Sequence, residues 1–509
     1  MTNVTMKKAQ ALFLSAAFLV APFSTASFAQ SEPAEFVNLL RSRVLIEGSE
    51  TRYTLEERMA RYNVPGLSLA VIDDGEIVYS AGFGLRQAEA SDLVDADTVF
   101  SAGSVSKIST AMLVLTLANE GVLDLDAPVL TQLRSWSLPT QPEFDQNRVT
   151  LRTILSHTSG FNMHGFRDFQ PGESLPSTIE TLEGQSPAVN DPLTLTFEPG
   201  SAFRYSGGGY TLAQLIVDDT DNRADFDAIA DEHLFTPLGM SRSRFTNPLP
   251  LDHGNIAFAH DDDGNPVARP RGYEAFPESA ASGLWTSAND LGGMIAALLS
   301  SYRSDGGYLP RPVVQDMMTQ VSPSEHGLGP RLEGRGSDFI FHHGGVNNSY
   351  HAWIEGHLAT GDGLVILNNG ANGSDLNTEI RNAVSDAMNW QINQPIRIPE
   401  IHLSSEQLES FTGSFSADSD YPHALRRLMN RGLFERGLSI QTNGKALTMT
   451  VEGNDGAIAL IPMTPNRFWI EGFGLRTDIA ELEFHRNAHG ETEAMTFHLV
   501  NASLHYVRD

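Results

Sequence analysis

The sequence predicts an α+β fold with a separate small β domain at its C-terminal end. Apolar segments typical of strands occur near residues 67–79 and again at 350–367, with helical patterns between them. Because the strands come from distant parts of the chain, one sheet has to be completed across the helical middle, with helices packed over it. Beyond Pro395 and Pro399, short apolar segments separated by turns predict an all-β unit.

The first strands form a predicted hairpin. Residues 67–72 and 76–79 flank Asp73-Asp74-Gly75, and an Asp-Gly pair between two apolar segments is typical of a tight hairpin turn. Helices are expected at 104–120, 211–219, 287–299 and 376–391, and later strands at 350–355 and 363–367. The main domain is therefore expected to occupy residues 36–393.

A linker is expected at 394–402, because its two prolines break the last helix and favour an extended chain. The domain after it is expected to occupy residues 403–509. Its predicted strands lie at 439–441, 447–451, 468–470, 482–484 and 495–499.

The N-terminus has the features of a secretory signal over residues 1–29. Lys7 and Lys8 precede an apolar run at 11–22, and small residues end at Ala29. That run is too short to span a bilayer, and no other long apolar stretch exists. We therefore expect an exported bacterial protein, periplasmic or secreted, without stable membrane insertion.

Composition excludes several functions for this chain of 509 residues. Without cysteine it has no disulfide, catalytic thiol or thiolate metal site. Its formal charge of −29 argues against nucleic-acid partners, which require a basic face. The run Asp261-Asp262-Asp263 lacks the spacing and closing Glu of a calcium loop, and consecutive His342 and His343 would point to opposite faces of a strand. We expect neither a metal nor a cofactor.

Lys107 is conspicuous because the chain almost avoids lysine. Apart from the two in the export segment, only Lys107 and Lys445 occur. Lys107 follows Ser104 by three residues on a predicted helix that is apolar nearly all round and therefore buried. Residues three apart on a helix share a face, so the amine can reach the serine oxygen. A desolvated lysine can lose its proton and activate a serine, whereas arginine stays charged.

Two further segments, at 203–210 and 341–346, complete a resemblance. With Ser104-Val105-Ser106-Lys107, they resemble in order the three motifs of the serine β-lactamase and penicillin-binding-protein superfamily. Segments 151–160, 237–240 and 281–287 resemble its class C and esterase branch. The resemblance implies an antiparallel sheet of five or more strands flanked by helices, beside a helical subdomain, with the site between them. Residues 408–415 resemble the opening of the lipocalin-like domain that follows many such hydrolases.

The resemblance also implies roles. Ser104 would attack a carbonyl carbon and form an acyl-enzyme, while Lys107 and Tyr205 share the general-base work; which of them accepts the proton stays open. The third motif, His-x-Gly, fits both His342-His343-Gly344 and His343-Gly344-Gly345. We prefer the first register, in which His342 is the catalytic histidine.

In that register the backbone N–H groups of Ser104 and Gly345 form the oxyanion hole. Gly207 and His343 are expected to border the substrate. Gly207 stands where the family often has Asn, and His342 stands where the β-lactamases have Lys. A mostly neutral imidazole attracts a substrate carboxylate less than lysine does.

These departures favour an exported serine hydrolase acting on small esters or D-amino-acyl amides and peptides. A β-lactamase or DD-carboxypeptidase is the first alternative. The second is a protein that is acylated without turnover, as an acyl-binding protein or sensor. The expected partner is a small ester, amide or peptide; the oligomeric state is left open.

Overall fold

A computed structural model describes residues 35–48, 50–169, 173–221, 224–267, 275–417, 436–453, 456–470, 480–499 and 502–509. The predicted export segment, residues 1–29, lies outside the described residues. Within those ranges, no helix combines the length and the apolar character needed to cross a membrane.

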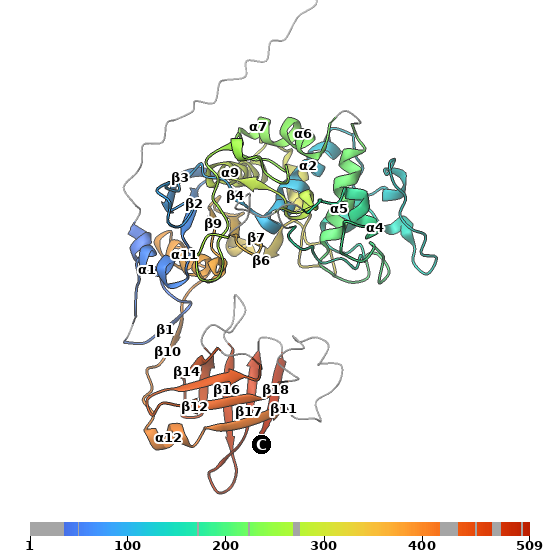
Figure 1. The fold of residues 1–509 in the computed structure, drawn as a ribbon. Helices are drawn as coiled ribbons and strands as arrows, with labels where there is room; N and C mark the ends of the chain where they lie inside the picture. Colours follow the sequence, from blue (N-terminus) through green and yellow to red (C-terminus); the bar gives the residue numbers. More distant parts are fainter. Residues whose placement is uncertain are drawn as a thin grey trace, which may run out of the picture.

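An antiparallel sheet of six strands, in the order β3-β2-β9-β8-β7-β6, forms the centre of the main domain (Figure 1). Its strands are β2 (Gly66–Asp73), β3 (Glu76–Gly84), β6 (Arg331–Glu333), β7 (Ile340–Val346), β8 (His351–His357) and β9 (Gly363–Asn368). The β2–β3 turn has positive φ at Asp74 (48°) and Gly75 (84°), as the predicted Asp-Gly hairpin requires. β2 pairs with β9 across almost three hundred residues of sequence, which confirms a sheet completed by distant segments.

Both faces of this sheet are covered. Leu67, Leu69 and Val71 of β2 pack in one apolar cluster with α11 (Gly373–Ala387) and α1 (Leu55–Arg61). Ala70 and Ile72, which point the other way, pack in a second cluster with α9 (Ala288–Arg303) and α2 (Ser106–Asn119). The strand is therefore apolar on both faces, which explains the continuous run in its sequence.

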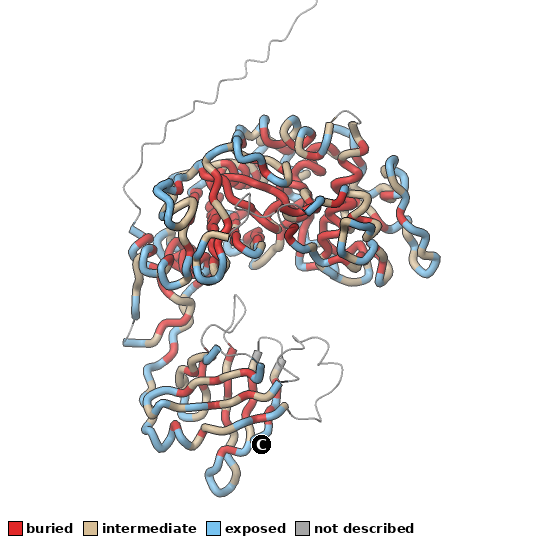
Figure 2. The backbone as a smooth tube through the Cα atoms, viewed as in Figure 1, coloured by how far each residue is buried: buried red, intermediate tan, exposed pale blue. Residues whose placement is uncertain are grey.

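Helix α2 is the buried helix that the sequence predicts, with every residue from Ser106 to Leu117 buried (Figure 2). Helices α4 and α5 lie at the far end of the domain from α1 and α11 (Figure 1). Further α-helices and strands of this domain are α3 (Leu151–Leu155), α4 (Thr178–Glu183), α5 (Gly207–Asp218), α6 (Phe226–Ala230), α7 (Thr236–Leu238), α8 (Ser279–Ser282), α10 (Arg311–Met317), β4 (Phe100–Ser101) and β5 (Trp285–Thr286).

The C-terminal domain is a closed antiparallel barrel of eight strands with an apolar core of its own, consistent with a lipocalin-like domain. The strands are β11 (Gly413–Ala417), β12 (Leu438–Thr442), β13 (Leu447–Val451), β14 (Ile458–Pro462), β15 (Arg467–Ile470), β16 (Glu481–Arg486), β17 (Thr492–Leu499) and β18 (Ala502–Arg508), preceded by α12 (Ser405–Glu409). Five of these strands coincide with predicted ones; β11, β14 and β18 were not among them.

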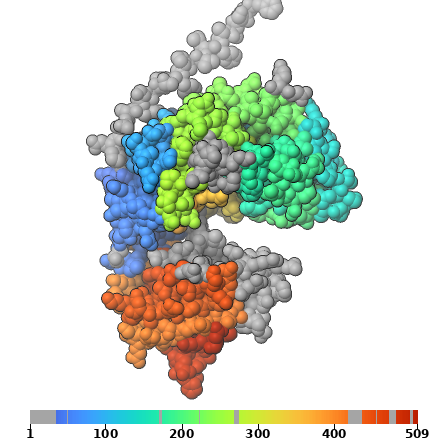
Figure 3. Space-filling view, in the orientation of Figure 1, coloured from blue at the N-terminus to red at the C-terminus, as the bar shows by residue number. Residues whose placement is uncertain are grey.

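The predicted linker contains a strand. β10 (Ile396–Ile398) pairs in parallel with β1 (Val44–Ile46), near the start of the main domain. Val44 and Ile398 pack with Trp469 of the barrel. The barrel, orange to red, thus lies beside the N-terminal part of the main domain, blue (Figure 3).

Candidate active site

Ser104 lies in a single 3₁₀ turn, Gly103–Val105, that leads directly into α2. Gly103 has φ of +50°, and a Cβ atom added to it would lie 2.9 Å from the Val346 backbone nitrogen. The backbone at the end of β7 therefore lies directly against the backbone of the turn that contains Ser104. Ser106 stabilises this turn, since its Oγ donates to the Gly103 carbonyl at 2.6 Å and accepts from the Leu284 N–H at 2.9 Å.

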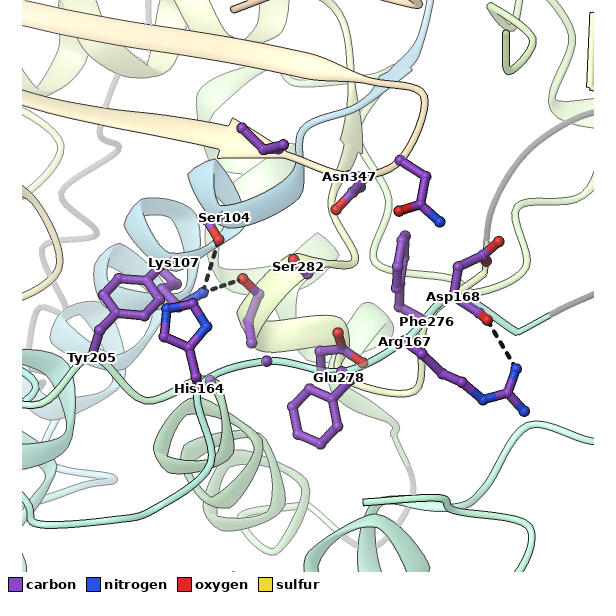
Figure 4. Close-up of a pocket in the computed structure, with 16 residues that line it drawn as sticks. Ser104, Lys107, His164, Arg167, Asp168, Tyr205, Phe276, Glu278, Ser282 and Asn347 are labelled. Atoms are coloured by element: carbon purple, nitrogen blue, oxygen red, sulfur yellow. Dashed lines mark hydrogen bonds between the residues drawn. The ribbon is translucent and has the colours of Figure 1, made fainter. Parts of the chain in front are cut away.

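Lys107 is buried beneath Ser104, with 2% of its surface exposed. Its Nζ donates hydrogen bonds to Ser104 Oγ at 3.3 Å and to the Ala281 carbonyl at 2.7 Å (Figure 4). The same nitrogen lies 4.9 Å from the centre of the Tyr205 ring. The structure thus brings Ser104, Lys107 and Tyr205 together, although Tyr205 is nearly a hundred residues away in sequence.

Imidazole rings surround Tyr205. The His157 ring stacks on it at 4.2 Å between centres, and the His164 and His343 rings lie at 5.1 and 6.2 Å. His157 Nδ1 also accepts a hydrogen bond from the Ser206 N–H at 3.1 Å. Since Ser206 caps α5, His157 holds the segment that carries Tyr205 at the start of that helix.

These histidines are neutral at pH 7. Burial, together with nearby His326 and Lys107, lowers the pKa of His157 and of His343 well below its usual range. Burial likewise lowers the pKa of His326 to about 3. The rings next to Tyr205 therefore add polar atoms and no positive charge.

The two histidines of the third motif lie on opposite faces of β7. His343 faces Tyr205 and His326, whereas the His342 ring stacks on Trp353 at 5.1 Å, with its Nε2 3.5 Å from Glu333. This placement differs from the register preferred from the sequence, which put His342 at the site. Alternate strand residues point to opposite faces, so a motif that fits two adjacent registers does not specify which face it uses.

A cavity of about 540 Å³ adjoins Ser104 (Figure 4). It is lined by Ser104, Lys107, His164, Gly165, Phe166, Arg167, Asp168, Tyr205, Gly207, Phe276, Glu278, Ala281, Ser282, Val346, Asn347 and Asn348. Of the predicted site residues, Ser104, Lys107, Tyr205 and Gly207 line it. His342, His343 and Gly345 do not.

Gly345 is buried, and a Cβ there would collide with the Ala102 carbonyl, whereas its neighbour Val346 is 60% exposed and lines the cavity. At Gly207, an added Cβ would lie 2.9 Å from the His164 carbonyl oxygen. The backbone of His164 therefore occupies space that an Asn side chain at position 207 would need.

Sequence reasoning missed Glu278, Asp168 and Asn347 in the cavity wall. A signal existed for Glu278, because it is the one charged residue in the small and apolar segment 275–284. No comparable sequence signal marks Asp168 or Asn347.

Comparison with known proteins identifies the family of the chain. A family model described as Beta-lactamase matches residues 52–387. Penicillin-binding protein 4 of Amycolatopsis lactamdurans is 30% identical over 199 residues, 39% of this chain and 49% of that protein. Esterase EstB of Burkholderia gladioli is 26% identical over 313 residues, 56% of this chain and 76% of that protein. The chain spans about half the length of the first curated relatives that it matches, which are penicillin-binding proteins.

Solved structures share the fold. The octameric penicillin-binding protein homologue from Pyrococcus abyssi superposes with a TM-score of 0.57 at 20% identity, covering 89% of this chain and 98% of that one. The D-alanine carboxypeptidase AmpC from Burkholderia cenocepacia superposes with a TM-score of 0.51 at 18% identity, covering 65% and 96%. Since the family model spans most of the chain, the protein belongs to the beta-lactamase family.

Proposed function

We propose that the protein hydrolyses small esters or D-amino-acyl amides through an acyl-enzyme on Ser104. The observation that carries this proposal is the contact of 3.3 Å between the buried Lys107 amine and Ser104 Oγ, at the wall of a cavity large enough for a small substrate. A serine hydroxyl becomes a nucleophile when an adjacent base takes its proton.

The reaction has two halves. Ser104 Oγ bonds to the substrate carbonyl carbon while its proton passes to Lys107 or Tyr205, and the leaving group departs with a proton from the same pair. Water then attacks the acyl-enzyme and gives up a proton to the pair. The bond between Ser104 Oγ and the acyl carbon breaks, the pair returns the proton to Ser104 Oγ, and the acid leaves. With His343 as the first residue of the third motif, the residue after the motif is Val346. We therefore assign the oxyanion hole to the Ser104 and Val346 N–H groups in place of Gly345.

The charge of the third-motif histidine bears on the class of substrate. His343 occupies the position of the β-lactamase lysine in the register that the structure favours, and its imidazole is neutral. A β-lactam carboxylate thus lacks that cationic partner. The relative named as an esterase and the neighbour named as a D-alanine carboxypeptidase support esters and D-amino-acyl amides as candidates. The test compares kcat/KM for a short-chain ester, a D-alanine amide and a cephalosporin; a preference for the cephalosporin would restore a β-lactamase.

Replacing Tyr205 with phenylalanine is expected to lower kcat by about 100-fold, because it removes a hydroxyl that takes part in proton transfer. The ring contacts with His157 and His164 persist, so the melting temperature should hardly change. Steady-state ester hydrolysis and thermal denaturation check both expectations. An unchanged kcat in a folded variant would reduce Tyr205 to a packing residue.

The register of β7 can be tested with a matched pair of variants. His343→Gln is expected to lower kcat by about tenfold or more, since it removes a ring that positions Tyr205 and small displacements at a reacting centre are costly. His342→Gln, on the Trp353 face, should retain most of the parent rate. The reverse order of effects would reinstate the first register.

Export stays a prediction, because it depends on residues 1–29, outside the described ranges.

A further inference from the structure

Glu278 is a buried carboxyl group in the wall of the cavity that contains Ser104 and Lys107 (Figure 4). Only 3% of its surface is exposed, and its Oε2 has no hydrogen-bond partner among the residues that the structure describes. It directly precedes α8, whose Ala281 carbonyl accepts the hydrogen bond from Lys107 Nζ. The carboxyl group is therefore close to the candidate nucleophile and its base.

Two other buried acids in the described part of the chain, Glu355 and Asp290, have evident structural partners. Glu355 is wholly buried and accepts two hydrogen bonds from Arg381, at 2.6 and 2.8 Å. Asp290 accepts from the Ser243 hydroxyl at 2.7 Å and from the Arg242 N–H at 2.8 Å. The Glu278 carboxyl has a hydrogen bond from its own backbone but no arginine or hydroxyl partner among the described residues, and a buried carboxylate so weakly partnered costs free energy.

The charged side chains near Glu278 leave its carboxyl group available to a ligand. Arg167, which lines the described wall of the cavity together with Lys107, forms an ion pair with Glu173 at 2.9 Å. Asp168 lines the same wall and is 6% exposed, so two carboxyl groups border the cavity. Burial raises the pKa of Glu278 to about 8, with Asp168 adding to the rise and Lys107 opposing it. Such an environment favours a cationic ligand, which would restore the charge of the carboxylate.

We propose that Glu278 binds a primary ammonium group on the acyl part of the substrate, so that amino-acyl esters or amides are the preferred acyl donors. The inference rests on the proposed function and narrows its substrate class. When the ammonium binds at neutral pH, the Glu278 carboxyl releases its proton to solvent and the two groups form an ion pair.

The test uses two substrates of nearly equal shape, the benzyl esters of D-alanine and of 2-methylpropanoic acid. A methyl group in the second replaces the ammonium of the first. The parent is expected to favour the alanine ester. Glu278→Gln should lower kcat/KM for that ester by about 10- to 100-fold, the usual effect of losing a charged hydrogen bond, and leave the uncharged ester almost unaffected.

Controls separate this role from others. Glu409→Gln, at an exposed position of α12, makes the same substitution outside the cavity and should not alter the ratio. If Glu278→Gln folds poorly, Glu278→Met replaces it in the test, because methionine has a similar volume. Thermal denaturation shows whether each variant is folded. An equal loss with both esters would make Glu278 a general acid or a packing residue and overturn the inference. Unchanged rates with both esters would overturn it as well.

A binding measurement distinguishes failure of the proposed hydrolysis from failure of ammonium recognition by Glu278. If the parent hydrolyses neither ester, calorimetry compares the binding of D-alaninamide and 2-methylpropanamide to the parent and to Glu278→Gln. Tighter binding of D-alaninamide that is lost in the variant supports ammonium recognition even then. Equal binding of the two amides by the parent overturns it.

Discussion

Replacing Ser104 with alanine is expected to abolish ester turnover. The variant retains the cavity and Lys107 but has no oxygen that can bond to the substrate carbon. Loss of the nucleophile in serine hydrolases lowers kcat by about 10⁴- to 10⁶-fold. The measurement is steady-state hydrolysis of a short-chain ester by the parent and the variant, with melting temperatures to show that both are folded.

Ser282→Ala is the matched control, because Ser282 lines the same cavity and is not within hydrogen-bonding distance of Lys107 in the described structure. This variant should keep most of the parent rate. Turnover that survives in Ser104→Ala and is lost in Ser282→Ala would move the nucleophile to α8.

Replacing Lys107 with arginine is expected to lower kcat by about 100- to 10,000-fold, the range for loss of a general base. The guanidinium stays protonated at any working pH and cannot accept the serine proton. It is also larger than the amine that fits between Ser104 Oγ and the Ala281 carbonyl. Single-turnover acylation by the folded variant measures the effect on the first half of the reaction directly.

Lys445→Arg provides the control, because Lys445 lies in the exposed turn between β12 and β13. This variant should keep the parent kcat. Lys107→Met tests whether the bulk of arginine causes the loss of activity. Methionine cannot accept a proton either, but its side chain is close to that of lysine in length. If Lys107→Arg retained more than about a tenth of the parent rate, the amine would not be the base.

Local patterns predicted much of this fold. The Asp-Gly turn specified the β2–β3 hairpin, and the apolar surface of residues 106–117 specified a helix buried in the core. Ser104 and Lys107 could be paired from sequence, because side chains three positions apart on a helix lie close together regardless of the rest of the fold.

Features that depend on tertiary structure were not predictable in this way. The two registers of the third motif satisfy the same sequence pattern, and only the packing of β7 places His343 toward Tyr205 and His342 toward Trp353. Glu278 reaches the cavity because α8 returns to Lys107 across 174 positions of sequence. β10 lies in a proline-containing segment, and its strand forms only because β1 lies alongside.

The central claim is that Ser104 is acylated and then released. Time-resolved mass spectrometry of the protein during ester hydrolysis, followed by peptide mapping, tests it most directly. The expected result is a transient mass increase equal to the acyl group, located on the peptide that contains Ser104 and lost as the acid appears. An adduct on another residue would contradict the account, as would an adduct on Ser104 that stops at one equivalent without turnover.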